Sequence, residues 1–267
     1  MEVFGRDLAP ISGEALAKID AQATASLTVN LSARRFVDVK GPYGWDYSAV
    51  PTGRFEKMQK DGAVAYGLRV SAPIIESRVE FELGLLELQN IDRGAADTDL
   101  APVERASIAM ASFEDKVVYR GLEKTGIPGM KSSSWYPPLE LPKADPEAFV
   151  HALIVATHAM KTGQSVGGPY ALVGGHALRD ALGRLISGRT LLDVLRGGTE
   201  IADYVFTPSF DEAFLVSTRG GDFEFTLGGD FTVGFDRREG DVLKFYLAES
   251  FAFRILESRA YRIIDLK

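Results

Sequence analysis

The decisive stretch of this sequence reads Arg34-Arg35-Phe36-Val37-Asp38-Val39-Lys40-Gly41-Pro42-Tyr43-Gly44-Trp45. Residues 35–39 predict a short strand, and Gly41-Pro42-Tyr43-Gly44 predicts the turn that ends it. Because side chains alternate along a strand, Arg34 and Arg35 would point to opposite faces and would not form one anion clamp. The turn leads into a long segment, residues 46–70, whose pattern indicates assembly rather than catalysis.

That segment predicts a two-stranded ribbon. Residues 54–59 and 63–70 flank Lys60-Asp61-Gly62, and Asp-Gly accepts the positive φ of a tight hairpin turn. A ribbon of this kind is marginal in water when it stands alone. We therefore expect neighbouring strands from other subunits to order it, which means that the chain associates with itself.

Three helices stand out by their apolar spacing and their end signals. The first helix is predicted to follow Ser12, which can cap it. The second is predicted over Pro102–Arg120, after Asp99. The third is predicted to begin at Asp145 and Pro146 and to end at Gly163. The apolar residues of the first helix recur at spacings of three and four and predict one narrow buried stripe: Leu16, Ile19, Ala23 and Leu27.

The remaining pattern alternates between short helices and strands, so the fold class is mixed α+β. Residues 79–85 alternate apolar and polar side chains, as a half-buried strand does. Residues 177–185 and 191–195 predict short helices on either side of a loop, and strand-like segments dominate residues 201–266. Two of these, around Phe223 and Phe231, predict a hairpin that turns at Gly228-Gly229-Asp230.

Composition narrows the class of protein. The chain has 267 residues, 46% hydrophobic and 25% charged, which is ordinary for a globular protein with one large core or two joined ones. The absence of cysteine excludes disulfides and thiolate metal sites and fits a cytoplasmic location. The net charge of −7 opposes general binding to nucleic acid, and no apolar run is long enough to span a membrane.

No catalytic or metal-binding constellation emerges. Gly163-Gln164-Ser165-Val166-Gly167 matches a hydrolase nucleophile pattern, but it follows a helix instead of a strand, and His176 is too close in sequence to complete the usual order. His151 and His158 are two helical turns apart, about 10 Å, which is too far to chelate one metal. We expect no catalytic residue, no metal and no cofactor.

Several separate motifs resemble those of the encapsulin shell proteins, the linocin-type family, over nearly the whole chain. The resemblance implies the fold of tailed-bacteriophage major capsid proteins of the Hong Kong phage type, with an N-terminal helix, an extended loop, a peripheral domain and an axial domain. The motifs besides the opening stretch are Arg6-Asp7-Leu8-Ala9-Pro10, Pro51-Thr52-Gly53-Arg54, Asn90-Ile91-Asp92-Arg93-Gly94, Phe113-Glu114-Asp115, Gly168-Pro169-Tyr170, Arg196-Gly197-Gly198 and Arg219-Gly220-Gly221-Asp222-Phe223.

The resemblance also implies domain boundaries. Residues 1–45 would form the N-terminal helix and the start of the peripheral domain, and residues 46–75 the extended loop. Residues 76–131 would continue the peripheral domain with its spine helix, residues 132–221 would form the axial domain, and residues 222–267 would supply the strands that return to complete both domains.

By resemblance, the chain is a structural subunit of an icosahedral cage that encloses a cargo enzyme bound through its C-terminal peptide. The cargo would be a ferritin-like protein or a dye-decolorising peroxidase, with roles in iron storage or oxidative stress. Seven residues match positions that bind this peptide in the family, and for each of them a role in filling the core is about as good an explanation as peptide binding. The candidate peptide-binding residues are Leu27, Leu31, Arg34, Asp38, Phe231, Val233 and Phe235.

The resemblance further implies that one loop lines a five-fold pore and that cyclic symmetry repeats Arg189 around it, favouring the passage of anions. The pore residues would be Leu185, Ile186, Ser187, Gly188, Arg189 and Thr190. Some relatives bind a flavin through an aromatic residue in the strand before Asn90, where this chain has Leu85-Leu86-Glu87. Without an aromatic ring at Leu86, we expect no flavin at that place.

Two alternatives stay open. The first is a prophage capsid protein of the same fold, which the position of the Arg6–Pro10 motif almost at Met1 disfavours because no scaffolding segment precedes it. The second is an enzyme, since members of the family have carried protease or bacteriocin labels.

Overall fold

The computed structural model describes residues 4–267, and the chain divides into two compact units. The first unit contains the described residues up to Val29 together with Lys40–Phe113 and Thr226–Ala252, and the second unit contains Asn30–Val39, Glu114–Phe225 and Phe253–Lys267.

The α-helices are α1 Gly13–Asn30, α2 Leu85–Asp92, α3 Ala101–Arg120, α4 Met130–Ser133, α5 Pro146–Gln164, α6 His176–Leu182 and α7 Leu191–Gly198, and the short 3-10 helices are η1 Arg6–Leu8, η2 Ala33–Arg35 and η3 Glu123–Thr125. The strands are β1 Asp38–Lys40, β2 Ala49–Phe55, β3 Gln59–Asp61, β4 Val64–Tyr66, β5 Arg69–Pro73, β6 Ile75–Gly84, β7 Gly121–Leu122, β8 Ile127–Pro128, β9 Leu139–Leu141, β10 Tyr170–Gly174, β11 Leu185–Ile186, β12 Arg189–Thr190, β13 Ile201–Phe206, β14 Ala213–Ser217, β15 Phe223–Leu227, β16 Thr232–Glu239, β17 Val242–Ile255 and β18 Tyr261–Leu266.

Side-chain caps set the helix starts that the sequence predicts. The Ser12 hydroxyl accepts a hydrogen bond from the Ala15 backbone N–H at 3.0 Å at the start of α1. Asp99 accepts from the Ala101 N–H ahead of α3, and Asp145 accepts from the Ala148 N–H at the start of α5, both at 3.0 Å. The three long helices are therefore confirmed, and the bounds predicted for the second and third agree within one residue.

The sheet of the first unit is built around β17, which pairs with β16 on one side and β6 on the other. Phe81 of β6 stacks on Phe245 of β17 with ring centroids 5.7 Å apart, and both rings are buried. In the order β1-β15-β17-β16, β15 also pairs with β17 and not with β16. The hairpin that we predicted around Gly228-Gly229-Asp230 is therefore wrong, because each of its strands pairs with the later, longer strand instead.

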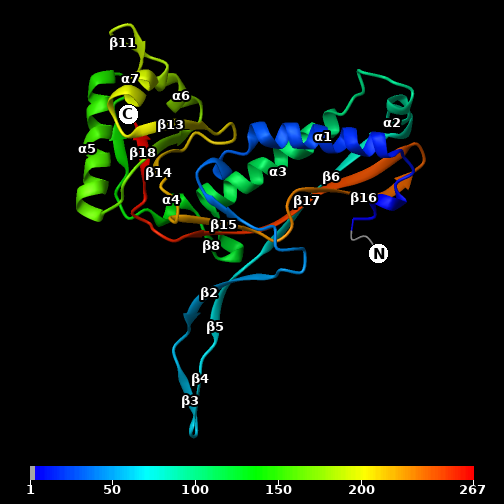
Figure 1. Cartoon of the computed structure of the whole chain (residues 1–267), viewed down its shortest axis with the longest axis horizontal. Helices are drawn as coiled ribbons and strands as arrows, with labels where there is room; N and C mark the ends of the chain where they lie inside the picture. The colour runs from blue at the N-terminus through cyan, green and yellow to red at the C-terminus, as the bar shows by residue number, and fades with distance from the viewer. Residues whose placement is uncertain (1–3) are drawn as a thin grey trace. The chain divides into compact units, whose positions relative to one another are not determined.

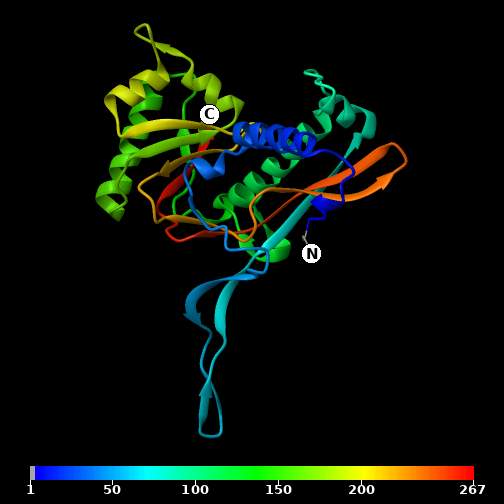
Figure 2. The ribbon, with the colours of Figure 1, turned by 45° about the vertical axis from the view of Figure 1, so that its right-hand side comes forward.

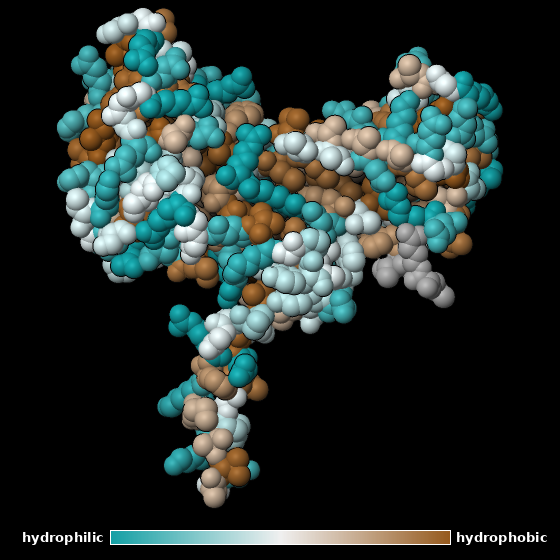
Figure 3. Space-filling view, viewed as in Figure 1, coloured by the Kyte–Doolittle hydropathy of each residue, from teal (hydrophilic) through white to brown (hydrophobic). Residues whose placement is uncertain are grey.

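The predicted ribbon is present in the first unit and is longer than one hairpin (Figures 1 and 2). β2 pairs with β5, and further out β3 pairs with β4 around Gly62, whose φ of +56° suits glycine. Figure 3 shows the ribbon as a narrow stalk with apolar and polar side chains mixed on its surface. Its exposed large apolar side chains are Phe55, Met58, Val64, Tyr66, Leu68 and Val70.

The second unit has a five-stranded sheet with the order β13-β10-β14-β18-β9. Every residue of β10 and of β14 is buried, so both faces of the middle of this sheet are covered. Phe214 of β14 stacks on Tyr119 of α3 at 5.5 Å, and Tyr261 of β18 lies 6.5 Å from Phe214. These rings form the core of the unit.

Three local predictions were wrong. Arg34 and Arg35 lie in η2 instead of a strand, and the strand begins only at Asp38, because the segment turns to give its backbone N–H groups to a buried carboxylate of α3. Leu86 lies in helix α2 instead of a strand, with Leu88 and Ile91 as its buried residues. Leu185 belongs to the β11–β12 hairpin instead of the preceding helix, which ends at Leu182.

Candidate functional site

The first unit contains a small pocket that three of the predicted peptide-binding residues line. Leu27 comes from the last turns of α1, while Val233 and the preceding Phe231 come from the start of β16. The pocket has a volume of about 220 Å³. Its full lining is Arg6, Asp20, Ala23, Thr24, Leu27, Phe231, Thr232, Val233 and Leu247.

An ion pair forms the polar rim of this pocket. The Arg6 guanidinium donates to both carboxylate oxygens of Asp20, at 3.0 and 2.6 Å, and to the backbone carbonyl of Val233 at 2.9 Å. Sequence analysis did not assign a role to either residue, although Arg6 is part of a quoted motif. An apolar floor with a fixed charged rim can hold an apolar side chain and orient the polar backbone that carries it.

Phe235 does not line this pocket. It follows Val233 on the same face of β16 and packs edge-on against Phe245, with centroids 5.4 Å apart. Phe235 is half-buried in the middle of β16, and its ring covers the buried ring of Phe245.

Leu31, Arg34 and Asp38 lie in the second unit, where the structure gives both charges partners within the chain. The Arg34 guanidinium donates to the buried Glu114 carboxylate, with Nε 2.9 Å from Oε2, and lies 5.5 Å from the Phe225 ring. The Asp38 carboxylate accepts a hydrogen bond from the Gly221 N–H at 2.6 Å. These contacts hold the segment after α1 in place.

The predicted pore residues form the β11–β12 hairpin of the second unit. Ser187 and Gly188 make its turn with φ of +50° and +81°, the backbone that two-residue hairpins favour. Leu185 is 67% exposed. The Arg189 guanidinium donates to the Asp193 carbonyl of α7 at 3.0 Å, so this charge is held against a helix and does not extend freely into solvent.

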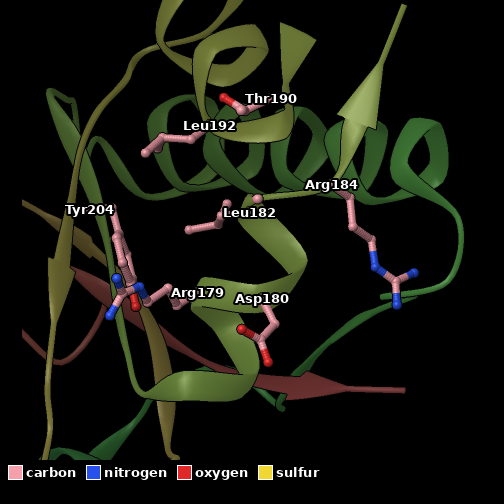
Figure 4. A pocket seen from close by; sticks show the side chains of 8 residues that line it. Arg179, Asp180, Leu182, Arg184, Thr190, Leu192 and Tyr204 are labelled. Carbon is pink, nitrogen blue, oxygen red and sulfur yellow. The ribbon is translucent and has the colours of Figure 1, made fainter. Parts of the chain in front are cut away.

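A larger hollow of about 660 Å³ lies beside this hairpin, and sequence analysis missed it (Figure 4). Leu182 and Leu192 supply apolar surface, while Arg179, Asp180 and Arg184 supply charge. The Tyr204 hydroxyl donates to the Gly174 carbonyl at 2.9 Å, and burial raises the pKa of Tyr204 to about 12. The hollow can bind a group with mixed polarity, and its tyrosine stays protonated at neutral pH.

The hydrolase-like motif has a structural role. Ser165 follows the last residue of α5 in the left-handed region, with φ of +59°, and its carbonyl accepts a hydrogen bond from Arg219 at 2.9 Å. The serine therefore lies at a helix end, as the loop interpretation predicts, and not on the strand-to-helix turn that such a nucleophile needs.

Among residues 4–267, no helix combines the length and the apolar composition needed to cross a bilayer.

Comparison with known proteins identifies close sequence relatives. A family model described as "Encapsulating protein for peroxidase" matches residues 1–252. A type 1 encapsulin shell protein of Rhodospirillum rubrum is 39% identical over 96% of this chain and 93% of its own length. One of Mycobacterium tuberculosis is 32% identical over 93% of both chains. These relatives are named as shell proteins and not as enzymes.

Solved structures with the same fold are particles and capsids. A virus-like particle protein from Pyrococcus furiosus matches with a TM-score of 0.67 at 16% identity, over 94% of this chain and all of that chain. The capsid protein of Myoviridae phage XM1 matches with a TM-score of 0.59 at 13% identity, over 88% and 91%. At these identities the likeness shows the fold alone, and it confirms the predicted tailed-phage capsid fold.

Proposed function

We propose, from the premise that this chain belongs to the linocin-type family of encapsulin shell proteins, that its copies close into a hollow icosahedral container in the cytoplasm. The family and the fold are those of self-assembling shells. The closed container, its contents and its openings are our proposal. Closing such a shell requires head-to-tail contacts that complete rings around symmetry axes.

The ribbon carries this proposal. Phe55 is 57% exposed and Leu68 is 68% exposed, on a two-stranded element that has no further strand beside it within the described chain. Isolated ribbons are marginal in water, and exposed apolar side chains in a row mark contact surfaces. A neighbouring copy would bury these side chains and so stabilise the ribbon in one conformation.

The test is the size of the particle that the purified protein forms. We expect wild type to form closed shells in electron micrographs and to sediment as a large particle. A Phe55→Asp, Leu68→Asp double variant should sediment as small species, because burying two carboxylates without partners opposes the contact. Val29→Asp, an equally exposed site on α1, serves as the matched control. Closed shells from the double variant would contradict the proposal.

We further propose that the pocket around Leu27 and Val233 receives apolar side chains from the C-terminal peptide of a cargo enzyme. The pocket's size, its apolar floor and its Arg6–Asp20 rim support this assignment. A weak site of this kind becomes effective when many copies face one confined volume. A peroxidase or a ferritin-like protein is the proposed cargo, and the description of the family as encapsulating peroxidase favours the former.

Leu31, Arg34, Asp38 and Phe235 do not line this pocket and stay predicted peptide contacts in their own right. Arg34 and Asp38 already bind Glu114 and the Gly221 backbone, so we expect their contribution to be the placement of the segment after α1 rather than a free charge pair.

Loading can be measured with a fluorescent protein fused to the C-terminal tail of the enzyme encoded beside the shell gene. We expect Leu27→Asp to abolish co-purification of the reporter with intact shells, because a carboxylate replaces an apolar side chain that is 6% exposed. Val29→Asp, two residues away and 73% exposed, should load normally. Full loading of intact Leu27→Asp shells would refute the pocket assignment without affecting shell formation.

The β11–β12 hairpin is our proposed lining of an opening for small solutes. Its glycine turn and short side chains leave room at the tip, and Arg189 adds a positive charge behind it. Arg189→Glu should slow the entry of small anions into loaded shells, and an unchanged entry rate would remove the electrostatic part of this proposal.

A further inference from the structure

A buried carboxyl group fixes the segment that follows α1. Asp115 of α3 has none of its surface exposed. Its Oδ1 accepts hydrogen bonds from the backbone N–H groups of Ala33 at 3.0 Å and Ser32 at 3.3 Å, and its Oδ2 accepts from the Ser32 hydroxyl at 2.5 Å. Three donors from one short segment therefore end on one side chain of the long helix.

The surroundings of this carboxyl group are dry. The Ser32 hydroxyl also contacts the Tyr119 hydroxyl at 2.7 Å, and Tyr119 is packed between Phe36 and Phe214. The remaining charges nearby come from the same two elements. On α3, Glu114 is buried and paired with Arg34, while Arg35 of η2 acts on Tyr119 through space.

The pKa of Asp115 is raised to about 7, mainly by burial and to a smaller extent by the adjacent Glu114 carboxylate. The hydrogen bonds from Ser32 and Ala33 lower this pKa, but burial has the larger effect. A carboxyl group that changes its protonation near neutral pH therefore lies where the chain passes from the first unit into residues 30–39.

The hydrogen-bond chain can reverse its direction with the protonation state of Asp115. When Asp115 is ionised, Tyr119 donates to Ser32 and Ser32 donates to Oδ2. When Asp115 is protonated, its O–H donates to Ser32, and the serine hydroxyl turns to donate to Tyr119. Oδ1 accepts the two backbone N–H groups in both states, and the Ser32 hydroxyl donates one hydrogen bond and accepts one in each.

We propose that Asp115 is a proton-controlled latch, which holds residues 32 and 33 against α3 more tightly when it is protonated. Once the segment opens, water reaches Asp115 and its pKa returns to near 4. The closed state therefore binds the proton more strongly than the open state. The stabilisation from protonation is complete below about pH 4 and is lost as pH rises through about 7.

Hydrogen exchange of the intact protein tests this latch at the two amides that donate to it. After correction for intrinsic exchange rates, protection of the Ser32 and Ala33 amides should fall by about tenfold per pH unit between pH 5 and pH 7 and then level off. The Ala148 amide, which donates to the exposed cap Asp145, is the matched control inside the same molecule and should show no such slope.

Two variants separate the latch from ordinary packing. Asp115→Asn keeps the shape and removes the titration, so its protection should not change with pH over this window. Ser32→Ala removes one donor that favours the ionised form, so the levelling-off should move to higher pH. A flat profile in wild type, the wild-type slope in Asp115→Asn, or a shift to lower pH in Ser32→Ala would each overturn the proposal.

Discussion

The middle strands β10, β14 and β18 of the second unit's sheet and the ribbon of the first unit are both paired antiparallel, yet they are stabilised in different ways. β14 has every residue buried, whereas β3 and β4 have every residue exposed. The sheet is stabilised by the burial of apolar side chains within its own subunit. The ribbon has its backbone pairs, but within residues 49–73 only Val50 at its root is buried, so we expect most of its stabilisation to come from another copy.

The largest expected effect is on the sheet. Phe214→Ala removes a ring that is 1% exposed and stacked on Tyr119, and we expect a loss of about 3–5 kcal/mol in the free energy of unfolding. Urea denaturation of dissociated subunits, followed by circular dichroism, measures this change. Phe55→Ala on the ribbon is the matched control and should stay within about 0.5 kcal/mol. Equal losses would mean that the two regions do not differ.

An intermediate effect is expected at the root of the ribbon. A Cβ at Gly229 would lie 2.0 Å from the Trp45 indole, which packs against Phe4 just before the ribbon begins. Gly229→Ala should cost about 1–3 kcal/mol by overpacking and should change the tryptophan emission.

Gly163→Ala provides the control for that variant. Nothing lies within 4 Å of a Cβ at Gly163, which is inside α5, so the same chemical change should be neutral or slightly stabilising. If Gly229→Ala were equally harmless, Trp45 would not anchor the ribbon.

The smallest effect on the subunit is expected at the ribbon itself. Leu68→Ser should leave the unfolding of dissociated subunits within about 0.5 kcal/mol of wild type, because the side chain is already in water. It should raise the concentration at which shells form by roughly tenfold or more, since a buried leucine contributes about 1.5–3 kcal/mol. Light scattering against protein concentration measures this threshold, and an unchanged threshold would place Leu68 outside any contact.

Local signals predicted much of this fold. The long helices follow from apolar spacing and from caps such as Ser12 and Asp145, because both act within a few residues of chain. The ribbon follows from Asp61-Gly62 between two strand-like segments. Leu27 and Val233, both candidate peptide contacts by resemblance, line one pocket, although nothing in their local patterns required them to meet.

The errors share a physical cause, which is contact between distant parts of the chain. The strand predicted over residues 35–39 begins only at Asp38, because Glu114 and Asp115, some 80 positions later, bind the Arg34 side chain and the Ala33 backbone. The predicted hairpin at Gly228–Asp230 fails because β17 offers longer pairing partners to both strands. The Arg6–Asp20 rim and the hollow at Tyr204 likewise depend on tertiary placement that a pattern of neighbours does not encode.

The connection between the ribbon and its sheet has a mechanical consequence. β5 continues into β6 with only Ile74 between them, and all ten residues of β6 pair with β17. A pull transmitted along the ribbon by a sister copy would therefore load these pairs in shear, all at once, instead of peeling them apart one by one. If the proposed container swelled, the hydrogen bonds between β6 and β17 would be loaded in shear, the direction in which a strand pair resists separation most.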